Sequence, residues 1–175
     1  MNAPVEIAGY DPGWPQTFAV LRDQIAGVLG PLAQRIEHVG STAVPGLPAK
    51  PIIDLDVVLA TPADLPEVIT RLAALGYQHQ GDLGITGRDA FDSPAAVPAH
   101  HLYVCPADSR ELARHLAFRD YLRACPGQAR AYADLKRSLA AQFRSDRDAY
   151  SRGKTTFVEQ ALTAAARSRL SLPPM

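Results

Sequence analysis

Two aspartates lie in the middle of an apolar run, and their spacing indicates chemistry with a cation. Asp54 and Asp56 stand within the apolar residues 51–59. Alternate side chains of a strand point to opposite faces, so the two carboxylates share one face while Ile53 and Leu55 share the other. Like charges about 7 Å apart on one face repel each other unless a cation lies between them. Carboxylate oxygens suit Mg²⁺ or Mn²⁺, so the pair predicts a divalent metal that carries a phosphate-rich ligand.

A Gly-Ser turn precedes the strand that carries the acids. Gly40 and Ser41 follow a short predicted strand at 35–39, and Ser41 with Thr42 opens a compact segment. At a helix start such a turn offers backbone N–H groups and a hydroxyl to phosphate, although the same residues also serve as an ordinary turn or cap. The segment is not a Walker A loop, because Lys50 is followed by proline instead of serine or threonine. The turn and the acids together predict metal-assisted phosphoryl or nucleotidyl transfer.

These motifs form part of a longer ordered series. Its pieces lie at 10–15, 38–47, 50–54, 87–88 and 100–102 and at Tyr150, Lys154 and Phe157. The Gly-Ser turn followed by Asp-x-Asp on a strand resembles the nucleotidyltransferase superfamily, and the series as a whole resembles the GrpB family of small bacterial proteins. The resemblance implies an α/β (α+β) fold, with a short mixed sheet, helices on one side and a C-terminal helical bundle packed against the cleft. It also implies that Gly40 and Ser41, with Thr42 beside them, lie against the phosphates of a nucleotide.

Three cations are candidates for phosphate contacts. The resemblance implies a triphosphate contact for Lys154, while the alternative is a solvated lysine. Lys50 stands just before the acid-bearing strand and has the same two interpretations. Arg88 lies in a predicted loop, where it would either close over phosphates or pair with Asp89 or Asp92.

The sequence departs from the superfamily pattern at one position. Active nucleotidyltransferases place a third carboxylate on a later strand, but residues 100–105 contain no Asp or Glu. Three interpretations stay open. His101 substitutes as a metal ligand or base, Asp89 or Asp92 enters from the loop, or the site binds nucleotide without turnover.

Apolar periodicity predicts the elements that position these residues. The predicted order is a helix after Pro15 that ends at Gly30, a strand at 35–39, the acid-bearing strand at 51–59, a helix from Thr61 to Gly76, a strand at 77–80, a loop or weak hairpin at 81–99, a strand at 100–105 and three helices from Ser109 onward. This is a βαβ-like core followed by helices. We expect residues 1–108 to form the nucleotidyltransferase-like core and 109–175 to form a helical part packed on the cleft, both within one structural unit.

Composition narrows the class of partner. The 175 residues include 18 basic and 18 acidic side chains, a formal net charge of zero, so neither membrane binding nor non-specific nucleic-acid binding is expected. Two cysteines without a C-x-x-C spacing, no secretory leader and no apolar run near the ~20 residues of a membrane span predict a reduced, cytoplasmic protein.

The sequence therefore predicts metal-dependent nucleotidyl transfer from a nucleoside triphosphate to a small acceptor, with Asp54, Asp56 and His101 at the chemistry. The alternative is a non-catalytic module that binds a nucleotide or phosphometabolite. A link to coenzyme A biosynthesis follows only from the resemblance, because GrpB-like domains occur fused to dephospho-CoA kinases.

Overall fold

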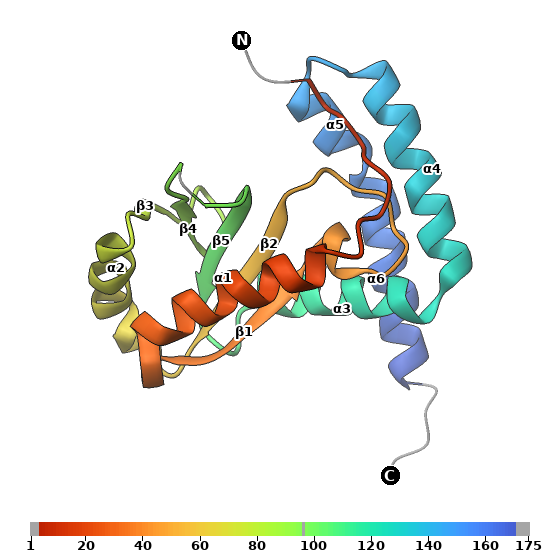
Figure 1. Cartoon of the computed structure of the whole chain (residues 1–175). Helices are drawn as coiled ribbons and strands as arrows, with labels where there is room; N and C mark the ends of the chain where they lie inside the picture. The colour runs from red at the N-terminus through yellow and green to blue at the C-terminus, as the bar shows by residue number, and fades with distance from the viewer. Residues whose placement is uncertain (1–3, 96, 171–175) are drawn as a thin grey trace.

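The computed structural model describes residues 4–95 and 97–170, and it combines a mixed sheet with helices on both of its faces (Figure 1). Its helices are α1 (Trp14–Leu29), α2 (Leu65–Ala74), α3 (Arg110–Ala124), α4 (Pro126–Gln142), α5 (Arg147–Gly153) and α6 (Thr155–Leu170), and its strands are β1 (Ala33–Val39), β2 (Ile53–Leu59), β3 (Gln78–Gly81), β4 (Asp89–Asp92) and β5 (His100–Cys105). Short 3-10 turns occupy Gly30–Leu32, Ser41–Ala43 and Pro62–Asp64. The predicted α/β class is confirmed.

The strands form one five-stranded sheet in the order β1-β2-β5-β4-β3. β2 and β5 pair in parallel at its centre, and every other neighbouring pair is antiparallel. The βαβ-like prediction is thus modified: α2 leads from β2 to β3, but β5 and β4 lie between those two strands. Burial explains this order, because β2 is buried almost throughout whereas the residues of β3 are mostly exposed, as suits an edge strand.

The two faces of the sheet are covered differently. Leu21 and Ile25 of α1 pack against Leu55 of β2 in the main core, which also includes Leu72 of α2. Figure 1 shows α1 in front of β1 and β2, with α3 behind them. On that second face Leu112 of α3 packs with residues of β2 and β5. Since the acids of β2 point to this second face, the C-terminal helices lie over the polar side of the sheet.

Residues 109–170 contain four helices, so the prediction of three was wrong. The missed helix is α5, which has only seven residues and no apolar period. Asp146 caps it by accepting a hydrogen bond from the N–H of Ala149 at 2.9 Å. A Cβ atom on Gly153 would lie 2.5 Å from Cδ2 of Leu139, so glycine lets the end of α5 approach α4. This short helix brings Tyr150 and Lys154 to the cleft.

The region 81–99 was predicted as a loop or weak hairpin, and the hairpin is present. β4 pairs with β3 in antiparallel fashion around a turn in which Leu83 has a positive φ of 48°. Residue 96 lies outside the described residues, as do the ends 1–3 and 171–175 of the two predicted parts. The helix predicted from Thr61 begins as a 3-10 turn with a capping box at Thr61 and Asp64 before α2 starts.

The N-terminal segment joins the sheet to the C-terminal helices. The N–H of Val5 donates to the carbonyl of Arg144 at 2.8 Å, and Ala8 forms a bridge with Ala49. Val5 also packs with Leu139 of α4. The start of the described chain therefore restrains both sides of the cleft.

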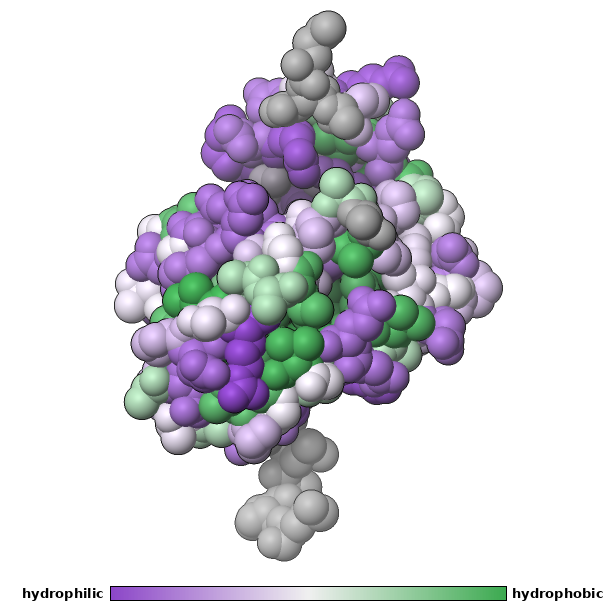
Figure 2. Space-filling model, turned by 60° about the vertical axis from the view of Figure 1, so that its left-hand side comes forward, coloured by the Kyte–Doolittle hydropathy of each residue, from purple (hydrophilic) through white to green (hydrophobic). Residues whose placement is uncertain are grey.

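Within the described ranges, none of the helices has the length and hydropathy to cross a membrane. Figure 2 shows hydrophilic and hydrophobic side chains intermixed on one face, with hydrophilic ones predominating toward the top.

Replacing Leu102 by alanine tests the central pairing. Leu102 is fully buried in β5 between β2 and β4. Leu102→Ala should lower the free energy of unfolding by about 2–5 kcal/mol because it leaves a cavity. Val20→Ala, at an α1 side chain that is 45% exposed, should change it by less than about 0.5 kcal/mol. Urea denaturation measures both, and equal effects would contradict the assigned core.

Candidate functional site

The parallel pairing of β2 with β5 sets the register of the site. Asp54 lies opposite His101, and Asp56 lies opposite Tyr103. Partners across a sheet point to the same face, so the acids, the imidazole and the phenol form one polar patch. The next strand on the other side, β1, delivers the Gly-Ser turn directly opposite the start of this row, because Val39 pairs with Asp54.

Asp54 is held from two sides. The Nδ1–H of His101 donates to Oδ1 of Asp54 at 2.8 Å. Gly40 lies against the other carboxylate oxygen, where a Cβ atom would overlap Oδ2 of Asp54, and its φ of +70° is one that glycine adopts without strain. The side chain of Asp54 is 28% exposed and that of His101 is 45% exposed, so both are accessible to a ligand.

Asp56 is more deeply placed, and its partner was missed in the sequence. Its Oδ2 accepts a hydrogen bond at 2.7 Å from Nδ1–H of His115, a residue of α3. Burial disfavours the charged imidazole, but the hydrogen bond and charge of Asp56 outweigh burial and raise the pKa of His115. Oδ1 of Asp56 is buried and has no partner among the described residues. His115 shares a helical face with the buried Leu112 and Leu122, a signal that it points inward.

A pocket of about 280 Å³ opens beside Asp54. It gathers most of the predicted residues and several that were not predicted. Those predicted are Ser41, Thr42, Lys50, Asp54, His101 and Lys154, and those missed include Lys136 and Arg147. Tyr150, noted in the sequence only as part of a motif, also lines it. The acid end of the pocket is thus formed by the sheet, and the basic end by α4, α5 and the loop before β2.

Lys136 bridges the basic end to the Gly-Ser turn. Its Nζ donates to Oγ of Ser41 at 3.0 Å, across 95 positions of sequence, and to the carbonyl of Pro48. Burial, with smaller contributions from nearby cations, lowers its pKa to about 7. Lys136 follows Tyr132 by four positions on the buried side of α4, and this placement of a lysine in an apolar stripe is the signal that could have found it.

Two further lysines share one aromatic ring. Nζ of Lys50 lies 4.6 Å from the ring centroid of Tyr150, and Nζ of Lys154 lies 4.4 Å from it. Burial and the charge of Lys50 lower the pKa of Lys154 to about 8. Burial and the charge of Arg147 also lower the pKa of Lys50. A cluster of cations in a partly buried site is a candidate binding site for a multiply charged anion.

Three predicted residues do not line this pocket. Asp56 lies deeper, and Gly40 contributes through its contact with Asp54. Arg88 is placed elsewhere: its guanidinium carbon lies 4.1 Å from the ring centroid of Tyr103, and its Nε is buried without a partner in the described chain. The stacking explains why Arg88 does not extend toward the lysines. The buried Thr42 bonds to His38, whose pKa falls to about 4 because of burial.

Two carboxylates on one face of β2 are the oxygen donors available to a divalent cation. In the parts of the chain that the structure describes, no three His, Cys, Asp or Glu side chains form a cluster that could hold a metal. The orphaned Oδ1 of Asp56 is nevertheless a buried anionic oxygen, and such an atom requires a partner. Asp54 supplies further oxygen donors on the same strand face. This donor set suits Mg²⁺ or Mn²⁺.

Comparison with known proteins identifies the family. The family model described as GrpB protein matches residues 4–164. The chain belongs to the GrpB family. It is similar to a UPF0157 protein of Pseudomonas aeruginosa, with 41% identity over 92% of this chain and 67% of the relative, and to UPF0157 protein YqkA of Bacillus subtilis, with 36% identity over 93% of this chain. The chain spans only 48% of the length of YqkA.

Solved structures support the same assignment. The crystal structure of conserved protein GrpB from Enterococcus faecalis matches 95% of this chain and 100% of that chain, with a TM-score of 0.86 and 30% identity. The structure of the GLD-2/RNP-8 complex matches with a TM-score of 0.59 at 13% identity over 86% of this chain and 60% of that one, which shows the fold alone. This GrpB-family chain therefore has a nucleotidyltransferase-type fold, as predicted.

Gly40→Ala should damage the acid pair without removing an acid. The added methyl group would overlap the carboxylate of Asp54 and would occupy a backbone conformation that disfavours side chains, so Asp54 must turn away from His101. The NMR chemical shifts of the His101 imidazole should therefore change relative to the native protein. Gly9→Ala, where a Cβ atom meets nothing within 4 Å, is the matched control. Unchanged His101 chemical shifts in Gly40→Ala would refute the contact.

Inorganic triphosphate should bind more weakly as pH rises from 7 to 9. The lowered pKa values of Lys136 and Lys154, about 7 and about 8, mean that each loses its proton in this interval. An anion favours the protonated forms, so binding takes up protons, and affinity falls by up to about tenfold per lysine for each pH unit above its pKa.

Calorimetry in buffers of different ionisation enthalpy measures this proton uptake. Lys136→Met should reduce the uptake, whereas Arg22→Gln on α1 should leave it unchanged. A pH-independent affinity would show that these lysines do not contact the anion.

Proposed function

We propose that this GrpB-family protein transfers a nucleotidyl group from a nucleoside triphosphate to a small acceptor. The observation that carries the proposal is the single pocket in which Asp54 and His101 lie at one end and Lys50, Lys136 and Lys154 at the other. An acid end suits a metal and the reacting phosphate, while a basic end suits the remaining phosphates. The nucleotidyltransferase-type fold supports this assignment of roles to the two ends of the pocket.

The basic end binds the β- and γ-phosphates. Lys154 and Lys50, both against the ring of Tyr150, neutralise charge, and the hydroxyl of Ser41 is held by Lys136. In our proposal the backbone N–H groups of the 3-10 turn at Ser41–Ala43 donate to the same phosphates. These contacts fix the triphosphate so that its α-phosphorus lies toward Asp54.

The acid end holds the acceptor and its proton. Asp54 and Asp56 are the residues that would hold Mg²⁺ or Mn²⁺, which when bound neutralises charge on the phosphate oxygens. His101 donates Nδ1–H to Asp54, so its neutral form keeps an unprotonated Nε2. In our proposal Nε2 takes the proton of the acceptor hydroxyl while the hydroxyl oxygen bonds to the α-phosphorus. The bond between the α-phosphorus and the oxygen that bridges it to the β-phosphate then breaks, and pyrophosphate leaves.

The same arrangement predicts a metal preference. A neutral imidazole brings no negative charge where a third carboxylate is expected, and both nitrogens of His101 are engaged, so only the two carboxylates would hold the metal. Mg²⁺ demands near-ideal octahedral geometry and loses its water reluctantly, so this incomplete donor set would hold it poorly. Activity should therefore prefer Mn²⁺.

Pyrophosphate release, measured with each of the four nucleoside triphosphates and a panel of small hydroxyl acceptors, tests the proposal. Asp54→Asn, Asp56→Asn and His101→Ala should each lower turnover by about 10²-fold or more. His101→Ala should retain nucleotide affinity, because the lysines are intact. Asp23→Asn, an exposed acid of α1, is the control and should keep full activity.

A non-catalytic module is the alternative, favoured by the absence of a third acid in residues 100–105. A dephospho-CoA kinase of Mycolicibacterium paratuberculosis is 29% identical to this chain over 43% of its own length, so a phosphometabolite of coenzyme A biosynthesis is a candidate ligand. Thermal shifts with the nucleotides and with dephospho-CoA separate the two. Nucleotide binding without pyrophosphate release under Mn²⁺ favours the module, and no shift with any nucleotide overturns the enzyme.

A further inference from the structure

A second, larger hollow lies on the other side of the segment that follows the Gly-Ser turn. It has a volume of about 690 Å³ and lies between residues 44–48 and α4, with the end of α3 closing one side. None of its lining residues lines the pocket of about 280 Å³ beside Asp54, which we call the phosphate pocket after its proposed ligand. A hollow of this volume accommodates a small organic molecule. We name it the arginine groove.

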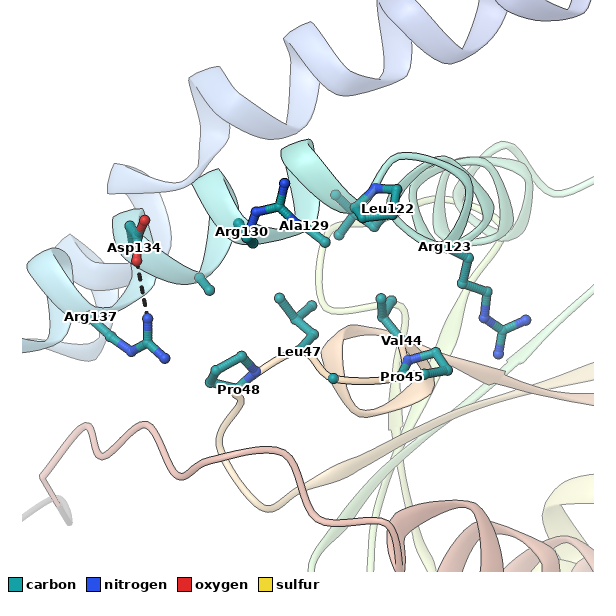
Figure 3. A pocket seen from close by; sticks show the side chains of 13 residues that line it. Val44, Pro45, Leu47, Pro48, Leu122, Arg123, Ala129, Arg130, Asp134 and Arg137 are labelled. Carbon is teal, nitrogen blue, oxygen red and sulfur yellow. Dashed lines mark hydrogen bonds and ion pairs between the residues drawn. The ribbon is translucent and has the colours of Figure 1, made fainter.

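The floor of the arginine groove is apolar and well packed. Val44, Leu47, Leu122 and Ala133 are all buried and belong to one apolar cluster with Tyr132. Figure 3 shows Val44 and Leu47 pointing from the loop toward α4, with Leu122 above them at the end of α3. Such a floor favours the apolar part of a ligand, because each buried CH₂ group contributes about 0.8 kcal/mol.

The rim is strongly basic. Arg123, Arg130 and Arg137 line the groove together with a single acid, Asp134. The whole chain has a formal net charge of zero, so this local excess of cations is a property of the groove. Figure 3 places Arg123 at one end and Arg137 at the other, with Arg130 between them.

The three guanidinium groups are not equally available. Nε and Nη2 of Arg123 both donate to the carbonyl of Ala43, at 2.9 and 2.7 Å, so this arginine mainly fixes the loop. Arg137 pairs with the exposed Asp134 at 3.0 Å on the helix surface, a contact worth little in water. Arg130 is exposed and has no hydrogen bond or ion pair within the described residues. Arg130 and Arg137, about two helical turns apart on α4, flank Ala133.

We infer that the arginine groove binds a soluble organic anion with an apolar body. The body lies over Leu47 and Ala133, and a phosphate monoester or carboxylate headgroup pairs with Arg130 and Arg137. Guanidinium groups match both headgroups through paired N–H donors, and the apolar floor distinguishes this ligand from a free inorganic anion. The inference is independent of nucleotidyl transfer, because it involves neither the acids nor the lysines of the phosphate pocket.

Octyl phosphate and octanoate are suitable probes, with inorganic phosphate and octanol as the two half-molecules. Titration calorimetry of the full chain without nucleotide or metal should show binding of at least one of the two anions, at least tenfold tighter than either half-molecule. The tighter of the two anions identifies the headgroup. If neither anion binds, the inference is wrong.

Variants locate the bound probe. Replacing both arginines of α4 (Arg130→Gln and Arg137→Gln) should weaken binding at least tenfold without unfolding the chain, since both side chains are exposed. Ala129→Phe, which fills the groove beside Arg130, should weaken it as well, with circular dichroism to confirm folding. Arg22→Gln is the matched control. Unchanged binding in the double arginine variant overturns the inference, and so does probe affinity that is lost equally in Arg22→Gln.

Discussion

The burial of Asp56 is the constraint on which the arrangement of this protein depends. A carboxylate that is 1% exposed in a central strand is unfavourable unless charge or hydrogen bonds compensate it. His115 supplies one such bond from α3, at 2.7 Å, and thereby attaches the C-terminal helices to the polar face of the sheet. Together with the bonds from Lys136 to Ser41 and from Val5 to Arg144, this docking holds α4 and α5 over Asp54 and joins the basic half of the pocket to its acid half.

Negative and positive side chains lie on opposite sides of the cleft. The sheet contributes carboxylates that are each bonded to an imidazole, while the helices contribute lysines whose pKa values are lowered by burial and by one another. Tyr150 contacts both Lys50 and Lys154, and burial raises its pKa to about 12, so the ring stays neutral beside the two cations. The lysines of the pocket therefore repel one another, and a bound anion would reduce this repulsion. Such perturbed groups are common at functional sites.

The sequence predicted the parts of this design that are local. Alternation in β2 and β5 placed Asp54 with Asp56 and His101 with Tyr103, because a strand has a fixed period and its neighbours here are buried. Strand alternation cannot predict which helical side chains will contact the strands and the turn. Lys136 and His115 lie on helices whose apolar stripes were read as core, and their contacts with Ser41 and Asp56 span 95 and 59 positions. The short helix α5 was missed for a related reason, since its seven residues are stabilised by packing on α4 instead of by periodicity.

The parallel pairing of β2 with β5 also bears on the stage of synthesis at which the cleft can form. Asp54 and His101 are 47 positions apart, with α2 and the β3–β4 hairpin between them, so their pairing closes a long loop. Lys154 arrives later still, on a helix that follows α3 and α4. During synthesis the sheet can therefore assemble with its acids before α4, α5 and α6 have left the ribosome. The acid face of that nascent sheet lacks Lys136, Arg147 and Lys154, and these cations reach Asp54 only when α4 and α5 have emerged.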